Sequence, residues 1–374
     1  MTIVIYLLLA SMFFYIGMLL WFIVGNMFSD SISDSKDTPA VSVIIAIRNG
    51  EDALSHLLTN LSLQDYTGEM EFILVDDESE DSSKIIIQEK ISNDRRFIYE
   101  SSTNGNHAFR HKKRALDAGI KRAVHEWLLF TDADCHMKSS WVRAMASQFS
   151  KDVDYVVGYS EVERDNLLVT RFQSFDFLML MIAARGSANS GKAWASSGQN
   201  QAYRKSLFNK MRGFTQISDE LQGDDSLFLQ ICRKQYSAKV IFSDKPECRI
   251  ISRKEKTWGA FIKQRMRWAG DANVMWKFNG SFFLSILTTF LLHLLLLVTF
   301  FAGIIHDPDY FIVFIKFLTI HFILEFILYF VGVHQLDKSI QFIDFCLWFI
   351  IHIPYIVLIG IGSFFANQLS WRGR

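Results

Sequence analysis

Hydrophobic residues are spread along this chain in two different ways. Four long apolar runs occur at residues 3–25, 281–304, 311–333 and 341–365. Each run is long enough to cross a bilayer core of about 30 Å as a helix that rises about 1.5 Å per residue. The first run lacks the basic start and small-residue cleavage site of a signal peptide. The pattern therefore predicts four transmembrane helices.

Between the first and second runs, short β-branched segments alternate with amphipathic ones. The segments that read as strands are 41–47, 71–75 and 127–130, and those that read as helices are 54–63 and 81–92. Strands that alternate with helices are typical of a mostly parallel sheet covered by helices on both faces. The expected fold class is thus an α/β domain with added transmembrane helices.

Composition and charge sharpen this picture. Half of the chain is hydrophobic and its formal net charge is zero, so charge predicts no nucleic-acid partner. Basic residues outnumber acidic ones just before the second apolar run, which places residues 26–280 in the cytosol by the positive-inside tendency. Four spans would then leave the closing residues 371–374 (WRGR) outside. Either the tail tolerates this, or one apolar segment is re-entrant or interfacial.

Acidic residues follow two of the predicted strands. Asp76 and Asp77 end or follow the second, and Asp132 and Asp134 follow the third with only an alanine between them. Ligands of such sheets bind beyond the carboxyl ends of the strands, although aspartate is also common in turns and helix caps. Two carboxylates flanking a small residue suit Mg²⁺ or Mn²⁺ shared with substrate phosphates. No phosphate-binding loop of the G-x-x-x-x-G-K-[ST] type occurs, which argues against a P-loop kinase or ATPase.

Three further segments carry candidate chemistry, each with a structural alternative. A predicted helix begins with three basic residues, Lys112, Lys113 and Arg114. Their charges could bind a diphosphate, or they could form a solvated face of the helix. In Gly223-Asp224-Asp225, Asp224 suits a helix cap and Asp225 a general base. Gln264-Arg265-Met266-Arg267-Trp268 offers an arginine fork for a diphosphate and a ring for a sugar, or an interfacial belt. Residues 197–200 line a sugar pocket or form a surface turn.

Seven segments in order, VSVIIAIRN, FILVDDESED, HKKRALDAGI, LLFTDADC, SGQNQAYRKSLF, GDDSLFL and QRMRWA, closely resemble the family 2 glycosyltransferases of the GT-A fold over residues 40–275. The resemblance implies an inverting, single-displacement transfer from a nucleotide sugar, most often a UDP-sugar. It implies that Asp132 and Asp134 hold the metal and the diphosphate and that Asp225 is the catalytic base. Where many relatives have glycine and asparagine around the first lysine, this chain has His111 and Asp117.

The resemblance also assigns binding residues. Those expected at the donor nucleotide are Arg48, Asn49, Asp76, Asp77, Lys112, Lys113 and Asp132. Those expected at the acceptor or diphosphate are Gly198, Asn200, Asp224, Gln264, Arg267 and Trp268. The last three match the Q-x-x-R-W motif of processive synthases and ceramide glucosyltransferases, which closes over the donor diphosphate and the acceptor end.

The expected organisation is a membrane anchor at 1–27, a linker at 28–39, a GT-A domain at 40–278, three transmembrane helices at 279–366 and a basic tail at 367–374. The leading hypothesis is transfer of a hexose or N-acetylhexosamine to a lipid or lipid-linked acceptor, at the cytosolic face of a bacterial inner membrane, in cell-envelope biogenesis. Alternatives are a processive polysaccharide synthase, a nucleotidyl or phosphoryl transferase with the same metal chemistry, and a non-catalytic membrane scaffold. The membrane bilayer itself is an expected partner.

Overall fold

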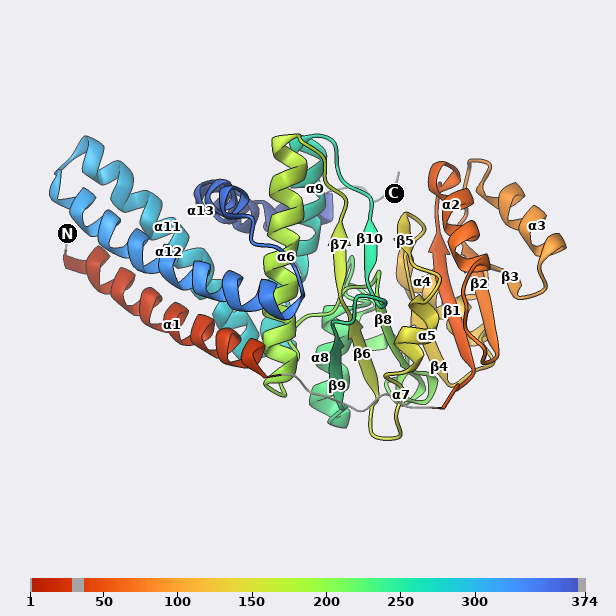
Figure 1. The fold of residues 1–374 in the computed structure, drawn as a ribbon. Helices are drawn as coiled ribbons and strands as arrows, with labels where there is room; N and C mark the ends of the chain where they lie inside the picture. Colours follow the sequence, from red (N-terminus) through yellow and green to blue (C-terminus); the bar gives the residue numbers. More distant parts are fainter. Residues whose placement is uncertain (1, 29–36, 369–374) are drawn as a thin grey trace. The chain divides into compact units, whose positions relative to one another are not determined.

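The computed structural model describes residues 2–28 and 37–368 (Figure 1). Its α-helices are α1 Thr2–Met27, α2 Glu51–Ser62, α3 Ser83–Asn93, α4 Lys112–Arg122, α5 Trp141–Ala146, α6 Leu168–Asn189, α7 Lys205–Lys210, α8 Ser226–Tyr236, α9 Trp258–Ala269, α10 Met275–Phe278, α11 Gly280–Ile305, α12 Asp309–Gln335 and α13 Phe342–Gly362. Its strands are β1 Val41–Ile47, β2 Met70–Asp76, β3 Phe97–Ser101, β4 Trp127–Phe130, β5 Cys135–Met137, β6 Tyr155–Gly158, β7 Ser160–Val162, β8 Gln201–Arg204, β9 Val240–Ser243 and β10 Ile250–Ser252.

The chain forms two compact units. Within the described residues, the sheet unit contains 37–163 and 193–254, and the helical unit contains 2–28, 164–192 and 255–368. The sequence predicts one continuous catalytic domain at 40–278. In the structure, residues 164–192 and 255–278 belong instead to the helical unit, together with the long apolar helices. The reason is aromatic packing: Phe175 of α6 lies 5.6 Å from Trp348 of α13, and Phe261 of α9 stacks on Tyr355 of α13 at 5.7 Å between ring centres. Most of the predicted linker and tail lies outside the described residues.

The sheet unit is built on a seven-stranded sheet in the order β3-β2-β1-β4-β8-β6-β9. All neighbouring strands pair in parallel except β8, which is antiparallel to both β4 and β6. A second sheet has the order β5-β10-β7. The predicted α/β fold with a mostly parallel sheet is confirmed, and the three predicted strands are found as β1, β2 and β4.

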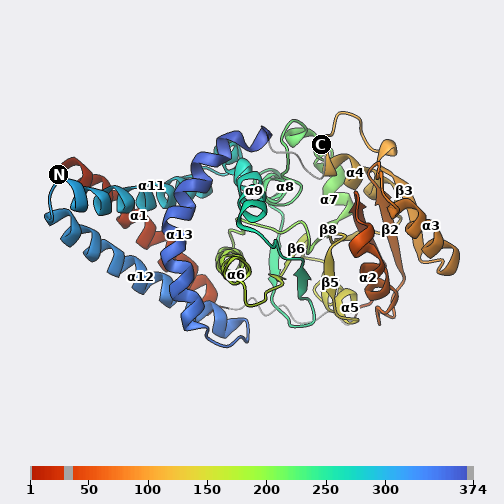
Figure 2. The ribbon, with the colours of Figure 1, turned by 90° about the horizontal axis from the view of Figure 1, so that it is seen from above.

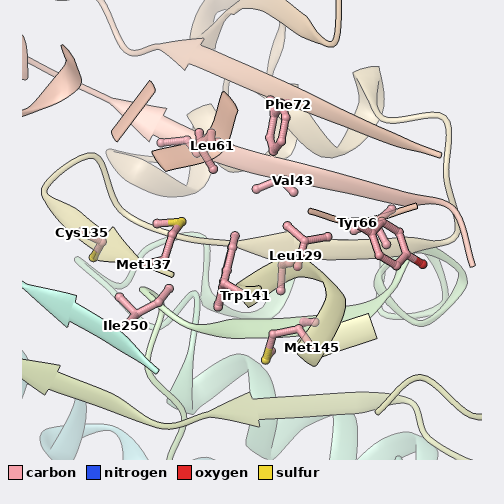
Figure 3. Close-up of a cluster of buried hydrophobic side chains, with 14 of the residues drawn as sticks. Val43, Leu61, Tyr66, Phe72, Leu129, Cys135, Met137, Trp141, Met145 and Ile250 are labelled. Atoms are coloured by element: carbon pink, nitrogen blue, oxygen red, sulfur yellow. The ribbon is translucent and has the colours of Figure 1, made fainter. Parts of the chain in front are cut away.

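Helices cover both faces of the main sheet because β1 is apolar on both sides. Val43 faces a core cluster that also contains Leu61 of α2 and Trp141 of α5 (Figure 3). On the other face, a Cβ added to Gly119 of α4 would lie 2.6 Å from a side-chain carbon of Ile44, so only glycine permits this close helix-to-strand approach. Continuous apolar strands of this kind are expected in a parallel sheet that is buried on both faces.

The helical unit contains four helices that are long and apolar enough to cross a membrane: Ile3–Met27, Gly280–Ile305, Asp309–Gln335 and Phe342–Phe365. They match the four predicted spans. In Figures 1 and 2, α1, α11 and α12 run side by side. Their many exposed leucine, isoleucine and phenylalanine side chains are those expected of a surface that faces lipid.

Polar side chains also meet inside this helix bundle. On α12, His321 Nε2 lies 3.7 Å from Glu325 Oε1. Tyr15 of α1 donates its hydroxyl to Glu325 and lies 3.1 Å from His321 Nε2. The rings of His293 and His352 follow at centre-to-centre distances of 5.0 Å, first from His321 to His293 and then from His293 to His352. Polar contacts of this kind hold helices together where no water competes.

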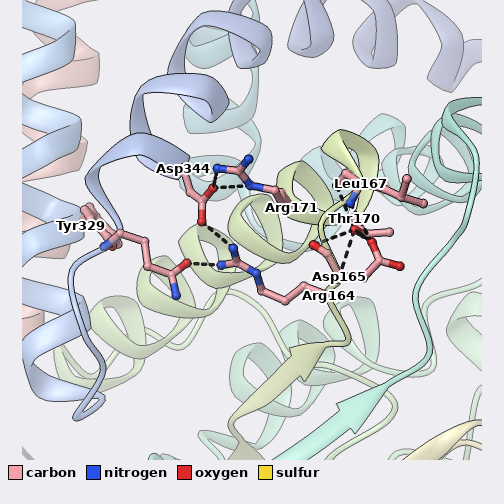
Figure 4. A network of polar contacts seen from close by, with 8 residues as sticks. Arg164, Asp165, Leu167, Thr170, Arg171, Tyr329 and Asp344 are labelled. Atoms are coloured by element: carbon pink, nitrogen blue, oxygen red, sulfur yellow. Dashed lines mark hydrogen bonds and ion pairs between the residues drawn. The ribbon is translucent and has the colours of Figure 1, made fainter.

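The helix α6 is tied to its neighbours by close packing and charge. A Cβ on Gly25 of α1 would lie 2.0 Å from the carbonyl oxygen of Gly186 on α6, so the two backbones meet directly. At the other end of α6, Arg171 and the nearby Arg164 both pair with Asp344 of α13 (Figure 4). The helix is therefore fixed to two of the candidate membrane helices.

Candidate active site

Three parallel strands bring polar residues to one edge of the sheet. Arg48 and Asn49 follow β1, Asp76 ends β2 opposite Ile47 of β1, and Asp132 lies two residues beyond the end of β4. The carboxyl ends of parallel strands are where open α/β sheets bind ligands. The sequence pattern thus placed these residues at the correct edge.

The first part of the site surrounds Asp77, whose side chain is fully buried. Its backbone N–H donates to the carbonyl oxygen of Ile47 at 2.7 Å, and its own carbonyl oxygen accepts from Arg48 Nη1 at 2.7 Å. Arg114 Nη2 lies 3.5 Å from Asp77 Oδ1 and donates to Glu78 Oε2 at 2.7 Å. Arg48 therefore holds the loop after β2, and Arg114 places a cation beside Asp77.

Asp76 and Asn49 shape the same loop. Asp76 Oδ1 accepts from the backbone N–H of Ser79 at 3.1 Å, and its Oδ2 accepts from the Tyr99 hydroxyl at 3.4 Å. Burial and the Asp76 carboxylate raise the pKa of Tyr99. Asn49 has a φ of 47° and accepts the backbone N–H of Glu80 with its side-chain oxygen at 2.9 Å. These bonds preorganise a polar loop at the edge where donor binding is predicted.

The second part of the site is a carboxylate cluster around a lysine. Lys112, the first residue of α4, has its Nζ 2.6 Å from Asp132 Oδ1 and 3.5 Å from Asp224 Oδ2. Although burial disfavours the ammonium, Asp132 and Asp224 raise the pKa of Lys112 above its ordinary value. Asp134 lies in the turn just before β5, which the 3.2 Å bond from the Cys135 N–H to the Asp132 carbonyl closes.

The cluster continues to Asp225 through Gly198. The backbone N–H of Gly198 donates to Asp225 Oδ2 at 3.2 Å, and the N–H of Ser226 donates to Asp225 Oδ1, so this carboxylate caps α8. A Cβ on Gly198 would lie 3.3 Å from both Asp224 Oδ2 and Lys112 Nζ. Burial, and then the negative charge of Asp224, raise the pKa of Asp225 to about 6. A carboxylate with a pKa near neutral suits a general base.

Lys113 holds the loop at residues 220–223, which leads into Asp224 and Asp225. Its side chain is buried, and its ammonium donates to the carbonyl oxygens of Glu220 and, at 2.8 Å, Gln222. Gly223 follows with a φ of +99°, a conformation that favours glycine. Lys113 thus holds the loop that presents Asp224 and Asp225, whereas Lys112 reaches the carboxylates themselves. The assignment of Lys113 to donor binding stays a prediction.

Asn200 is also committed to the fold. It is fully buried, accepts from Trp141 Nε1 at 3.1 Å, and donates to the carbonyl oxygens of Tyr159 and Cys248 at 2.8 Å each. These bonds fix the end of the 197–200 turn, and therefore the position of Gly198. The predicted contact of Asn200 with an acceptor stays a prediction.

The donor set suits a divalent cation that is shared with a substrate. Among the described residues, no three His, Cys, Asp or Glu side chains are arranged around one ion position. Asp132 and Asp134 still offer two hard carboxylates, and Mg²⁺ is commonly held by one or two carboxylates together with substrate phosphates. The contact of Lys112 with Asp132 shows that this cluster accommodates positive charge. The residues present therefore fit a metal that is completed by a diphosphate.

The motif residues Gln264, Arg267 and Trp268 lie on α9 of the helical unit. Gln264 Nε2 donates to Glu255 Oε1 at 3.3 Å. Sequence reasoning missed the residue between them, Arg265, which is the most buried of the five motif side chains. The signal for Arg265 was its helical spacing, because it lies four residues after Phe261 on the buried face of α9.

Comparison with known proteins identifies the fold and the family. The family model for glycosyl transferase family 21 matches residues 3–374. Among curated proteins, a poly-β-1,6-N-acetyl-D-glucosamine synthase of Staphylococcus epidermidis is 23% identical over 63% of this chain and 55% of its own length. The enzyme of the same name from Staphylococcus aureus strain MSSA476 is 22% identical over 61% and 53%. The chain thus spans little more than half the length of these relatives.

A solved structure is similar over nearly the full length. The mannosyltransferase PcManGT from Pyrobaculum calidifontis, determined in complex with GDP-Man and Mn²⁺, superposes with a TM-score of 0.62 at 15% identity, over 96% of this chain and 99% of that one. This likeness supports the GT-A fold, and the resemblance to family 2-type glycosyltransferases is confirmed. The chain is therefore a GT-A glycosyltransferase with four candidate membrane helices, and it belongs to glycosyl transferase family 21.

Proposed function

We propose that this glycosyltransferase moves a sugar, with inversion, from a nucleotide-diphosphate donor to a hydroxyl group of an acceptor at the membrane. The observation that carries the proposal is the arrangement around Gly198. Its backbone N–H holds the buried carboxylate of Asp225, while Lys112 links Asp224 to Asp132 next to it. The proposed base and residues expected at the diphosphate thus belong to one cluster, which supports a single displacement.

In this mechanism Asp225 accepts the proton of the acceptor hydroxyl as that oxygen bonds to the anomeric carbon. The bond from the anomeric carbon to the diphosphate oxygen breaks, and its electron pair leaves with the nucleoside diphosphate. Lys112 places positive charge beside the leaving group, where preorganised charge is worth most. Asp132 and Asp134 would hold a divalent metal, which supplies further Lewis-acid stabilisation of the diphosphate.

The donor class rests on the loop at the carboxyl end of β2. Asp76 and Asp77, with Arg48 and Asn49 supporting the loop, form the predicted nucleoside contact, and Arg114 adds a cation beside them. The similar mannosyltransferase was solved with GDP-Man and Mn²⁺, which supports a nucleotide sugar and a divalent metal here. We expect Mg²⁺ or Mn²⁺ to serve.

For the acceptor, the relatives favour the alternative over the leading hypothesis of the sequence. Both staphylococcal enzymes are named as synthases of a poly-N-acetylglucosamine, so we propose a growing polysaccharide as the first candidate acceptor. A single transfer to a lipid or lipid-linked acceptor is the second candidate. It is kept because the family 21 match covers the four candidate membrane helices as well as the sheet unit, whereas the matches to the two staphylococcal synthases cover 63% and 61% of the chain. The basic residues before α11 support a cytosolic sheet unit.

The test is product analysis with membranes that contain the full chain. The membranes are incubated with Mn²⁺ and a labelled donor, using UDP-N-acetylglucosamine, UDP-glucose and GDP-mannose in parallel. Labelled long chains support the first candidate, and one sugar added per lipid supports the second. The Asp225→Asn variant is the control. If that variant turned over at the wild-type rate, or if pyrophosphate were released rather than nucleoside diphosphate, the proposed transfer would be wrong.

A further inference from the structure

One carboxylate in the helical unit joins three helices. Asp176 of α6 is 4% exposed, and its Oδ2 lies 3.1 Å from Nη2 of Arg265 on α9, which is also 4% exposed. Its two oxygens also accept from Trp348 Nε1 and the Tyr355 hydroxyl of α13, at 3.4 Å each. Asp176 therefore ties the motif helix to α6 and to a candidate membrane helix at a single point.

Arg265 in turn fixes the last residue of the motif. Its guanidinium carbon lies 4.4 Å from the ring centre of Trp268 and 5.1 Å from that of Phe261. The ring of Trp268 also lies 6.0 Å from that of Phe177, which is the neighbour of Asp176 on α6. A planar guanidinium stacked on an indole limits the orientations that the ring adopts. The pose of Trp268 is thus set through the ion pair.

A second contact from α6 orients the first residue of the motif. Gln173 Nε2 donates to the carbonyl oxygen of Glu255 at 2.7 Å, and Gln173 Oε1 accepts the Glu255 N–H at 3.0 Å. The Glu255 carboxylate then accepts from Gln264 Nε2 at 3.3 Å. Since Gln173 and Asp176 are three residues apart on one helix, they face α9 together. The helix α6 is thus a platform for both ends of the motif.

Charge at this buried position needs a reason, because well-packed apolar residues often give equal or greater stability than a buried ion pair. A paired guanidinium and carboxylate, unlike two apolar side chains, fix distance and orientation through directional bonds. We propose that Asp176 is a positioning residue of the transfer reaction. It acts through Arg265 to hold Gln264, Arg267 and Trp268, the residues expected at the acceptor or diphosphate, in one orientation. This inference rests on the proposed function.

The experiment compares variants of the full chain in detergent. Asp176→Asn removes the charge, Arg265→Lys keeps the charge but loses the planar stack, and the double variant Asp176→Asn/Arg265→Gln leaves no unpaired charge. The control is Arg171→Gln, which breaks a different ion pair of α6, the one to Asp344 of α13 (Figure 4), and leaves the pair of Asp176 with Arg265 in place. For each variant, kcat, donor KM, affinity for the nucleoside diphosphate and the thermal midpoint are measured.

We expect Asp176→Asn and the double variant to lower kcat by roughly 100-fold, the loss that follows from a shift of about 1 Å in a positioning group. Arg265→Lys should retain more activity than either. Nucleoside diphosphate affinity should fall less than kcat, because the predicted nucleoside contacts lie in the sheet unit and only the expected diphosphate contacts of the motif are disturbed. Arg171→Gln should keep the wild-type kcat. If Asp176→Asn does not fold, the double variant and Arg265→Lys decide.

Two results would overturn the positioning role: a wild-type kcat in the folded double variant, or an equal loss of kcat in Arg171→Gln. The first would mean that the pair only stabilises the fold, and the second that any loosening of α6 has the same effect. Asp225→Asn is run in the same assay. If Asp225→Asn is active, the proposed function fails; if Asp225→Asn is inactive and the Asp176 variants are fully active, only the positioning role fails.

Discussion

The raised pKa of Asp225 predicts how the transfer rate depends on pH. Burial and the charge of Asp224 move this pKa from an ordinary 3.8 to about 6, which corresponds to a penalty of roughly 3 kcal/mol on the charged form. A general base works as the carboxylate, so activity should be present above the pKa and be lost as the pH falls through about 6. One pH unit below, roughly a tenth of the maximal rate should remain.

The perturbation that tests this reasoning is Asp224→Asn. Removing the neighbouring charge should lower the pKa of Asp225 and move the acid limb of the kcat profile to lower pH. The shift should be smaller than the whole displacement, because burial is the larger cause. The assay is nucleoside diphosphate release at saturating donor, acceptor and Mn²⁺ from acidic to neutral pH.

The controls separate Asp225 from other titrating groups. Asp225→Asn should lower kcat by about 100-fold or more and abolish the limb near 6, whereas ionisation of the donor would leave the limb in place. Replacing Asp65, an exposed carboxylate paired with Arg143, should leave the profile unchanged. An acid limb that stays in place or moves to higher pH in Asp224→Asn would refute the assigned cause.

Three further predictions concern the expected metal, the loop at 220–223 and the packing of α1 on α6. Asp134→Ala should abolish the Mn²⁺-dependent part of nucleoside diphosphate binding, measured by calorimetry with and without the metal, and unchanged binding would argue against a shared metal. Lys113→Met should lower the free energy of unfolding by about 1–3 kcal/mol, because the carbonyl oxygens of Glu220 and Gln222 lose their buried donor. Gly25→Ala should cost about 1–3 kcal/mol through overlap with the Gly186 backbone. The matched control is Gly17→Ala, whose added carbon meets no other part of the fold within 4 Å and which should not lower the thermal midpoint.

The positions of the acidic residues at the sheet edge were predictable, because the apolar pattern of each strand shows where that strand ends. Asp76, Asp77 and Asp132 follow buried parallel strands, so their meeting at one edge follows from the pattern alone. The four apolar helices were predictable for the same kind of reason, since length and hydropathy suffice for a membrane span.

The different contacts made by neighbouring residues were not predictable from the sequence. Lys112 and Lys113 are adjacent and chemically identical, yet one reaches carboxylates and the other buried carbonyl groups. That difference depends on a left-handed His111 before α4 and on where the distant 220–222 loop passes. The role of Arg265 was hidden for a similar reason, because its partner Asp176 is 89 residues away and carries no motif of its own.

The pairing of Asp176 with later parts of the chain has a consequence for biogenesis. The described part of the sheet unit is complete once residue 254 has been synthesised, whereas Asp176 must wait for Arg265 and then for Trp348 and Tyr355. Domains generally fold as units while the ribosome is still adding residues. A nascent chain stalled before residue 342 would therefore carry a folded sheet unit, but Asp176 would still lack its partners Trp348 and Tyr355. With the proposed positioning role, activity would begin only when α13 has packed against α6.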